Sequence, residues 1–318
     1  MENDLLRQLA IIFPGQGSQS PGMGKELAEN FPVARRVFEE ADDALGFSMS
    51  RLCFEGPAED LQLTENTQPA ILTVSVAAFR AMKEAGISAP AFVAGHSLGE
   101  YSALVAAGAL TLTNAVRTVR ARGRYMQEAV PVGTGAMAAV IGGELSEIER
   151  ICEEVRAGRV CSVANHNAPN QVVIAGNTEA VDRAIELLAG VARRVIKLKV
   201  SAPFHCALMT PAQDRLATDL AQLVFNEPAT PVVTNVDARA TTAPDQLRNA
   251  LVRQVSAPVR WWESMQLLMQ QGVETFVEAG PGKVLSGLMR QISRDVKTLN
   301  VENAASLEST QTALAAGN

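Results

Sequence analysis

Short apolar runs that end at glycine-rich turns alternate along the chain with amphipathic helical stretches. Leu9 to Phe13 is an apolar run that stops at Pro14-Gly15-Gln16-Gly17, and residues 91–95 repeat this pattern. Such runs predict buried strands that lead into loops. Over 25–44 and 67–85, apolar positions recur at three- and four-residue steps, which predicts helices. Strands that alternate with helices predict a parallel sheet covered by helices.

The pattern changes near Gly133. The segment that follows predicts, in chain order, a strand (136–141), a helix (145–157), two strands (160–164 and 172–175), a helix (178–188) and a strand (195–200). This βαββαβ order is typical of a ferredoxin-like unit. The α/β pattern resumes after Ser201, with a strand at 275–278 and a further helix. We therefore expect a small domain (132–201) inserted into a large one (1–131 and 202–318), with a cleft between them. The segment from about Ala304 is small and polar, and we expect it to fray.

Composition and charge narrow the class of protein. A chain of 318 residues with 47% hydrophobic side chains can bury a sizeable core. The net charge of −6 provides no basic surface for nucleic acid or an anionic membrane. Met1 to Asp4 carries acids where a signal peptide carries bases, and no apolar run approaches the roughly 20 residues that span a bilayer. We expect a soluble, cytoplasmic protein that binds neither nucleic acid nor membrane.

The four cysteines are scattered, with no Cys-x-x-Cys pair and no histidine cluster beside them. This spacing predicts buried or half-buried free thiols in a reducing compartment and no metal site.

The segment Gly95-His96-Ser97-Leu98-Gly99 follows a predicted strand and opens a predicted helix, 98–107. This is the context of a nucleophile elbow, in which the serine occupies a strained turn and small neighbours let strand and helix approach closely. A purely structural turn is the alternative. The amide of Leu98 would lie at the helix N-terminus, where an oxyanion can be stabilised. The loop around Gln16 is the expected source of a second amide donor, because parallel strand ends meet at one edge.

The chain has three histidines that could activate Ser97. We expect His96 to buttress the turn and His166 to lie in a loop of the small domain. His205 lies where the chain returns to the large domain, so it is the predicted base. The only aspartate between serine and histidine is Asp182, on the outer helix of the small domain. A backbone carbonyl or an amide side chain could therefore orient the histidine in place of a triad acid.

Seven segments together resemble a known family, the malonyl-CoA:acyl carrier protein transacylases and the related acyltransferase domains of polyketide synthases. They are Phe13-Pro14-Gly15-Gln16-Gly17-Ser18-Gln19, Gly95-His96-Ser97-Leu98-Gly99-Glu100-Tyr101, Arg122-Gly123-Arg124-Tyr125-Met126, Asn165-His166-Asn167, Gln171-Val172-Val173-Ile174-Ala175-Gly176, Pro203-Phe204-His205 and Glu278-Ala279-Gly280-Pro281-Gly282-Lys283-Val284-Leu285.

The resemblance implies an α/β fold with a hydrolase-like large domain and a ferredoxin-like insertion. It implies transfer of malonyl from malonyl-CoA to the phosphopantetheine thiol of acyl carrier protein, supplying fatty acid synthesis without a cofactor or a metal. Ser97 then matches the acylated nucleophile and His205 its base, with the amides of Gln16 and Leu98 as oxyanion donors. Gln254 matches the position whose backbone carbonyl orients the histidine.

The resemblance also implies substrate-binding residues. Arg122 matches the arginine that pairs with the free malonyl carboxylate, a group that guanidinium binds in bidentate fashion. By spacing alone, Arg117, Arg120, Arg122 and Arg124 all read as solvated charges of one helix, and only the motif selects Arg122. Phe204 precedes the base, where a ring is expected to exclude an α-methyl group. Asn165 and Asn167 flank a histidine where the family pattern leads us to expect an apolar or aromatic residue.

Three other functions are compatible with these residues. A serine thioesterase would use the same elbow, although it would leave Arg122 and the missing acid unexplained. A non-catalytic docking subunit would retain only the fold. A discrete acyltransferase of a polyketide or malonate decarboxylase system would look much the same in sequence. Acyl carrier proteins are acidic, and Arg193, Arg194, Lys197 and Lys199 are candidates for their docking. No exposed apolar stripe is evident, and we expect a monomer.

Overall fold

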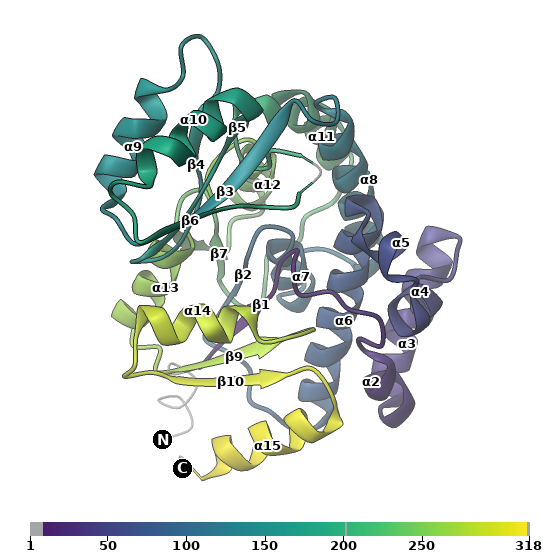
Figure 1. Ribbon diagram of the computed structural model, residues 1–318. Helices are drawn as coiled ribbons and strands as arrows, with labels where there is room; N and C mark the ends of the chain where they lie inside the picture. The colour runs from purple at the N-terminus through teal and green to yellow at the C-terminus, as the bar shows by residue number, and fades with distance from the viewer. Residues whose placement is uncertain (1–8, 201, 317–318) are drawn as a thin grey trace.

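The structure is a computed structural model that describes residues 9–200 and 202–316. Its larger sheet has six strands in the order β10-β9-β1-β2-β7-β8 (Figure 1). These strands are β1 (Leu9–Phe13), β2 (Phe92–Gly95), β7 (Val232–Thr234), β8 (Arg239–Thr241), β9 (Thr275–Ala279) and β10 (Lys297–Val301). All neighbouring pairs are parallel except β7 and β8. The predicted parallel-sheet core is confirmed.

Helices cover both faces of this sheet, as the uninterrupted burial of β1 requires. They are α2 (Lys25–Asn30), α3 (Pro32–Leu45), α4 (Met49–Glu55), α5 (Ala58–Gln62), α6 (Thr64–Glu84), α7 (Gly99–Ala106), α8 (Leu112–Glu128), α11 (Thr210–Ala221), α12 (Pro244–Gln254), α13 (Trp261–Gln270), α14 (Val284–Ile292) and α15 (Ala304–Ala315). Ile11 and Phe13 pack in one core cluster with residues of α3, α6 and α8, whereas Ile12 packs with residues of α13 and α14. Alternate residues of one strand thus enter two cores.

The helix predicted over 25–44 is two helices, α2 and α3. The chain is extended at Phe31, with φ −125° and ψ 111°, and Pro32 begins α3. The residue before a proline is disfavoured in the helical region, while proline itself fits the first turn of a helix. The apolar spacing continues across this break, which is why periodicity alone did not reveal it.

The smaller sheet has the order β4-β5-β3-β6, and its neighbouring strands are all antiparallel. Its elements are β3 (Gly135–Ile141), α9 (Leu145–Glu154), β4 (Cys161–Ala168), β5 (Gln171–Asn177), α10 (Thr178–Leu188) and β6 (Arg194–Lys197). The predicted βαββαβ order is confirmed. Both helices pack on one face of this sheet (Figure 1). Residues of the other face pack against Phe204 and Cys206. The domain boundaries at 131/132 and 201/202 stay a prediction, and Ser201 lies outside the described residues.

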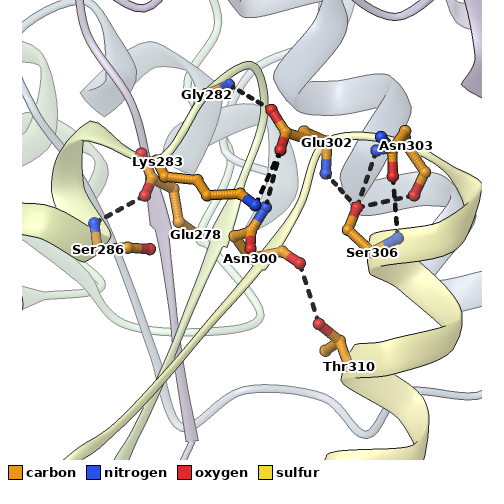
Figure 2. Close-up of polar contacts among 9 residues, drawn as sticks. All are labelled: Glu278, Gly282, Lys283, Ser286, Asn300, Glu302, Asn303, Ser306 and Thr310. Carbon is orange, nitrogen blue, oxygen red and sulfur yellow. Dashed lines mark hydrogen bonds and ion pairs between the residues drawn. The ribbon is translucent and has the colours of Figure 1, made fainter.

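The prediction that the chain frays from Ala304 is wrong, because this segment forms α15. Figure 2 shows its first turn, where Asn303 Oδ1 accepts from the amide of Ser306 at 2.9 Å and Ser306 Oγ accepts from the amide of Asn303 at 3.0 Å. Thr310 Oγ1 donates to the Asn300 carbonyl at 3.0 Å, and Leu307 is buried. The small polar residues that indicated disorder are therefore caps and tethers of a helix.

Within the described residues, no helix has both the length and the apolar character needed to cross a bilayer.

Candidate active site

Ser97 lies in the sharp turn between β2 and α7, with a φ of 52°. This left-handed conformation is strained for a residue with a Cβ atom. The turn depends on its two glycines. A Cβ at Gly95 would lie 1.9 Å from the backbone of Gly99, and a Cβ at Gly99 would lie 2.3 Å from the carbonyl oxygen of Phe13. The packing of strand on helix thus requires glycine on both sides of the serine and presents its hydroxyl at the sheet edge.

His205 is hydrogen-bonded to this hydroxyl, with 2.8 Å between Nε2 and Ser97 Oγ. Its other ring nitrogen, Nδ1, lies 2.8 Å from the carbonyl oxygen of Gln254, so Nδ1 carries the proton and Nε2 presents its lone pair to the serine. Burial, together with the nearby charge of Arg122, lowers the pKa of His205 to about 3. The imidazole is therefore neutral at neutral pH, which is the form that can accept a proton.

Arg122 is buried on α8 and its guanidinium reaches the same hydroxyl. Nη2 lies 3.1 Å from Ser97 Oγ and 2.9 Å from Gln254 Oε1, while Nη1 donates to Gln68 Oε1 at 2.7 Å. Burial lowers the pKa of Arg122 from its ordinary value. The next residue is Gly123, where a Cβ would lie 2.6 Å from the Thr64 carbonyl oxygen, so α8 packs closely on α6 at this point.

The other three arginines of α8 lie away from Ser97. Arg117 and Arg124 are exposed, and Arg120 stacks on Phe47 at 4.3 Å. Spacing along the helix gave no reason to separate Arg122 from this group. Its burial does.

The amides of Leu98 and Gln16 flank the serine from two adjacent strand ends. β1 and β2 pair in parallel with Phe13 opposite Gly95, so the loops that follow them share one edge. Leu98 stands at the N-terminus of α7, and no acceptor is found for its amide among the described residues. Gln16 and Leu98 both line the cavity in front of Ser97. Their role as oxyanion donors stays a prediction.

His166 does not lie in a loop, as predicted, but in strand β4, where it is buried. Its amide donates to the Val259 carbonyl at 2.9 Å, and its ring packs edge-on against Trp262 at 4.8 Å. The polar Asn-His-Asn run lacks the apolar alternation of an ordinary strand because the large domain covers it. His166 therefore has a packing role outside the cavity.

The asparagines on either side of His166 line the cavity. Asn167 Oδ1 lies 2.8 Å from His96 Nε2, and Asn165 forms an isolated parallel bridge with Val259. His96 thus joins the elbow to the small domain, in agreement with the expectation that it buttresses the turn.

These residues surround a cavity of about 230 Å³ between the two sheets. Its lining includes Gly15, Gln16, Gln68, His96, Ser97, Leu98, Arg122, Met126, Met137, Asn165, Asn167, Gln171, Val173, Leu198, Val200, Phe204, His205, Val284, Leu285 and Leu288. Helix α14 supplies the last three. Its first turn is held by Glu278, whose carboxylate accepts from the amide of Leu285 at 3.0 Å and from the amide of Ser286 at 2.7 Å. Figure 2 shows the contact with Ser286. This contact accounts for the glutamate at the head of the Glu278 to Leu285 motif.

Sequence reasoning missed three residues that support the site. Gln68 holds Arg122, while Asn235 Oδ1 accepts from the Ser97 amide at 2.7 Å. Glu100 is fully buried, and burial raises its pKa to about 7. Glu100 lies inside a motif quoted above, where its position after the elbow was a usable signal. Gln68 and Asn235 carry no local pattern.

Among the described residues, no group of three histidine, cysteine or acidic side chains could hold a metal ion.

A serine elbow at the edge of a parallel sheet, paired with a histidine and facing a buried arginine, is typical of the acyltransferase class. In agreement, the family model described as "Acyl transferase domain" matches residues 10–314. The chain belongs to the malonyl CoA-acyl carrier protein transacylases of this class. It is 52% identical over 288 residues to the enzyme of that name from Escherichia coli (strain K12), an alignment that covers 90% of this chain and 93% of the relative.

Solved structures agree with this assignment. An acyl carrier protein S-malonyltransferase from Vibrio cholerae is 48% identical, with a TM-score of 0.94 over 95% of this chain and 99% of that chain. A malonyl-transacylase in complex with a type II PKS acyl-carrier protein is also 48% identical, with a TM-score of 0.94 over 96% of this chain and 99% of that chain. The predicted fold class is confirmed by these likenesses.

Proposed function

We propose that the chain transfers malonyl from malonyl-CoA to the phosphopantetheine thiol of acyl carrier protein through an ester on Ser97. One observation carries the proposal. The hydroxyl of Ser97 lies 2.8 Å from the His205 ring and 3.1 Å from the Arg122 guanidinium. A nucleophile with its base and a buried cation for a free carboxylate therefore share one cavity.

In the first half of a ping-pong cycle, His205 takes the proton of Ser97 as the serine oxygen attacks the thioester carbonyl. The oxyanion is stabilised by the amides of Leu98 and Gln16. Coenzyme A then leaves as a thiol that carries the proton from His205. Arg122 grips the malonyl carboxylate throughout, with Gln68 and Gln254 fixing the guanidinium plane.

In the second half, the carrier thiol enters the same cavity, gives its proton to His205 and attacks the serine ester. The carrier thiol takes the place of coenzyme A, and the steps run in reverse: the bond between the acyl carbon and Ser97 Oγ breaks, and the serine oxygen regains its proton from His205. None of these steps needs a cofactor or a metal. A carbonyl oxygen orients His205 in place of a carboxylate. The carbonyl carries no full negative charge, so it does not raise the basicity of His205 as a triad carboxylate would. We expect this arrangement to favour transfer between thiols over attack by water.

The pathway and the compartment follow as proposals. We infer that the enzyme acts in the cytoplasm, because its four cysteines are buried free thiols, and that it supplies fatty acid synthesis. The relative bound to a type II PKS acyl-carrier protein is as similar as the Vibrio enzyme, which makes a polyketide carrier the second candidate acceptor. Parallel assays with a fatty acid carrier and a polyketide carrier would distinguish the two by kcat/KM.

The central experiment measures the intact mass of the protein after brief mixing with malonyl-CoA, followed by addition of phosphopantetheinylated acyl carrier protein. We expect a malonyl adduct on the wild type and none on Ser97→Ala, with discharge onto the carrier. Loss of the adduct to water at the same rate without carrier would indicate a thioesterase. No adduct on the wild type would leave only a binding function.

A further inference from the structure

Glu100 is a buried carboxyl that the proposed mechanism does not use. It lies on α7, three residues after Ser97, and it is fully buried. Removal of a carboxyl from water is costly, so a protein retains one in its interior only where hydrogen bonds or charges compensate. The partners of Glu100 are themselves the residues that hold the site.

Both hydrogen bonds of Glu100 end on a single oxygen. Oε2 accepts from the amide of Asn235 at 3.0 Å and from Gln254 Nε2 at 2.8 Å. The other oxygen, Oε1, has no hydrogen-bond partner among the described residues. One acceptor atom therefore joins a loop residue after β7 to the last residue of α12.

Asn235 holds the nucleophile. Its Oδ1 accepts from the Ser97 amide at 2.7 Å, and its Nδ2 donates to the Gly95 carbonyl at 2.7 Å. These bonds hold the backbone that leads into the strained turn, on the N-terminal side of the serine. A shift of Asn235 would be transmitted directly to the Ser97 backbone.

Gln254 holds the base and the arginine. Its backbone carbonyl accepts from His205 Nδ1 at 2.8 Å, and its side-chain Oε1 accepts from Arg122 Nη2 at 2.9 Å. Its Nε2 also donates to the Ser97 carbonyl at 3.0 Å and, at the longer distance of 3.4 Å, to Asn235 Oδ1. One residue thus contacts three groups around the reacting atoms: His205 through its backbone carbonyl, and Arg122 and Ser97 through its side chain.

We propose that Glu100 is a positioning residue that fixes Ser97 and His205 relative to each other by joining Asn235 to Gln254. This inference rests on the proposed roles of Ser97 and His205. This link between Asn235 and Gln254 requires an acceptor oxygen at a fixed distance from the backbone of α7. Because Oε1 is unpartnered, it can carry a proton while Oε2 keeps both hydrogen bonds, so the link is the same in either protonation state.

Three variants separate reach, charge and volume. Glu100→Gln keeps an oxygen at the same reach and removes the charge. Glu100→Asp keeps the charge and shortens the reach, while Glu100→Met keeps the volume and removes the acceptor. Ser102→Ala is the matched control, since Ser102 is buried on the same helix and none of the described residues is hydrogen-bonded to its hydroxyl.

Two measurements are made on the full chain. The first is the rate constant of Ser97 acylation at saturating malonyl-CoA, by rapid quench and intact mass. The second is the Nδ1–H resonance of His205 in protein labelled with ¹⁵N-histidine, a simple spectrum because the chain has three histidines. A residue that served only folding would leave this resonance unchanged in a folded variant.

We expect Glu100→Gln and Ser102→Ala to acylate within about threefold of the wild type, with the His205 resonance in place. Glu100→Asp and Glu100→Met lose about 10-fold or more in rate and shift or broaden that resonance. If one of these two does not fold, the other carries the comparison. The proposal is overturned if a folded Asp or Met variant acylates like the wild type, or if Glu100→Gln is as slow as they are. Failure of the wild type itself to form an adduct would instead overturn the proposed function.

Discussion

At the scale of single residues, Arg122 holds a buried positive charge with only neutral hydrogen-bond partners. Two amide oxygens and one hydroxyl accept from its guanidinium, and no carboxylate of the described residues does so. The buried carboxyl of Glu100 acts on this charge through space, without a hydrogen bond. A buried charge that no carboxylate binds directly is costly. A substrate carboxylate would supply the missing partner and offset the free-energy cost of burying the Arg122 charge. The site should therefore select acyl groups that carry a second carboxyl group.

Replacement of Arg122 by lysine is expected to lower kcat/KM for malonyl-CoA about 100-fold or more, because an ammonium group cannot bind a carboxylate in bidentate fashion. The rate of adduct formation measures this effect. Arg124→Lys, an exposed change on the same helix, should have no effect. Retention of wild-type loading by Arg122→Lys would contradict the assigned role.

The pKa of His205, lowered to about 3, gives a pH prediction. A lowered pKa means that the imidazole stays neutral until the pH falls close to the folded value, far below the ordinary histidine range. We expect the ¹⁵N resonances of His205 not to titrate between about pH 5 and 8. A midpoint near 6.5 would show that the ring is solvated and the pocket open.

Phe204 is half-buried at the cavity wall, directly before the base. Its ring is expected to hold kcat/KM for methylmalonyl-CoA roughly 10-fold or more below that for malonyl-CoA, the usual effect of one extra carbon in a tight pocket. Phe204→Ala should reduce the difference in kcat/KM between malonyl-CoA and methylmalonyl-CoA. Equal kcat/KM for the two substrates in the wild type would rule out this source of selectivity.

At this scale, a site residue can be predicted from the sequence when its role is marked by nearby residues, and not when its partners lie far away along the chain. Ser97 has a local signature, and His205 follows from elimination among three histidines. Arg122 is indistinguishable by spacing from its neighbours, and only resemblance singled it out. Asn235 and Gln68 act on partners far away in sequence, through single hydrogen bonds that leave no periodic trace.

At the scale of elements, the secondary structure predicted from the sequence is wrong where local composition and tertiary contacts favour different structures. Apolar spacing continues across Phe31, yet the proline that follows divides one helix into two. The polar stretch of β4 has no alternation because protein covers it, and the polar stretch after Ala304 is a capped helix. Strands with a clear apolar run, such as β1 and β9, could be predicted closely, since burial alone defines them.

The cap of α15 gives a test of stability. Asn303→Ala removes the side chain that accepts from the Ser306 amide, which is expected to cost about 1 kcal/mol. Urea unfolding measures this loss, and malonyl loading should be unchanged because α15 does not line the cavity. Ser309→Ala, at an exposed position of the same helix, should be neutral or slightly stabilising. Equal stability of Asn303→Ala and the wild type would show that the cap is not needed.

At the scale of the whole molecule, the charge is unevenly distributed. The chain carries −6 overall, yet Arg193, Arg194, Lys197 and Lys199 are all exposed along and beside β6, at the edge of the smaller sheet. Lys197 is ion-paired with Asp182, so the two arginines and Lys199 contribute most of the positive charge there. An acidic carrier would be steered to such an edge, and the effect would weaken as salt screens the charges.

Reversal of this edge in Arg193→Glu with Arg194→Glu is expected to raise KM for the carrier about 10-fold at low salt, with a smaller effect at high salt. Steady-state assays at two ionic strengths measure the change. Arg51→Glu serves as a control, because α4 lies on the opposite side of the molecule from β6 (Figure 1). A similar rise in both proteins would mean that total charge, rather than this edge, governs the encounter.

The carbonyl that orients His205 also bears on how this enzyme can change over evolutionary time. A main-chain oxygen is encoded by every codon, so no substitution at position 254 can delete the group that faces the histidine, whereas one point mutation removes the acid of a conventional triad. The side chain of Gln254, in contrast, is changed by any substitution at this position, and it contacts Arg122 and Ser97. Drift at this position would therefore alter which acyl groups are accepted before it abolished the chemistry, and it offers lineages a route to new substrates through active intermediates.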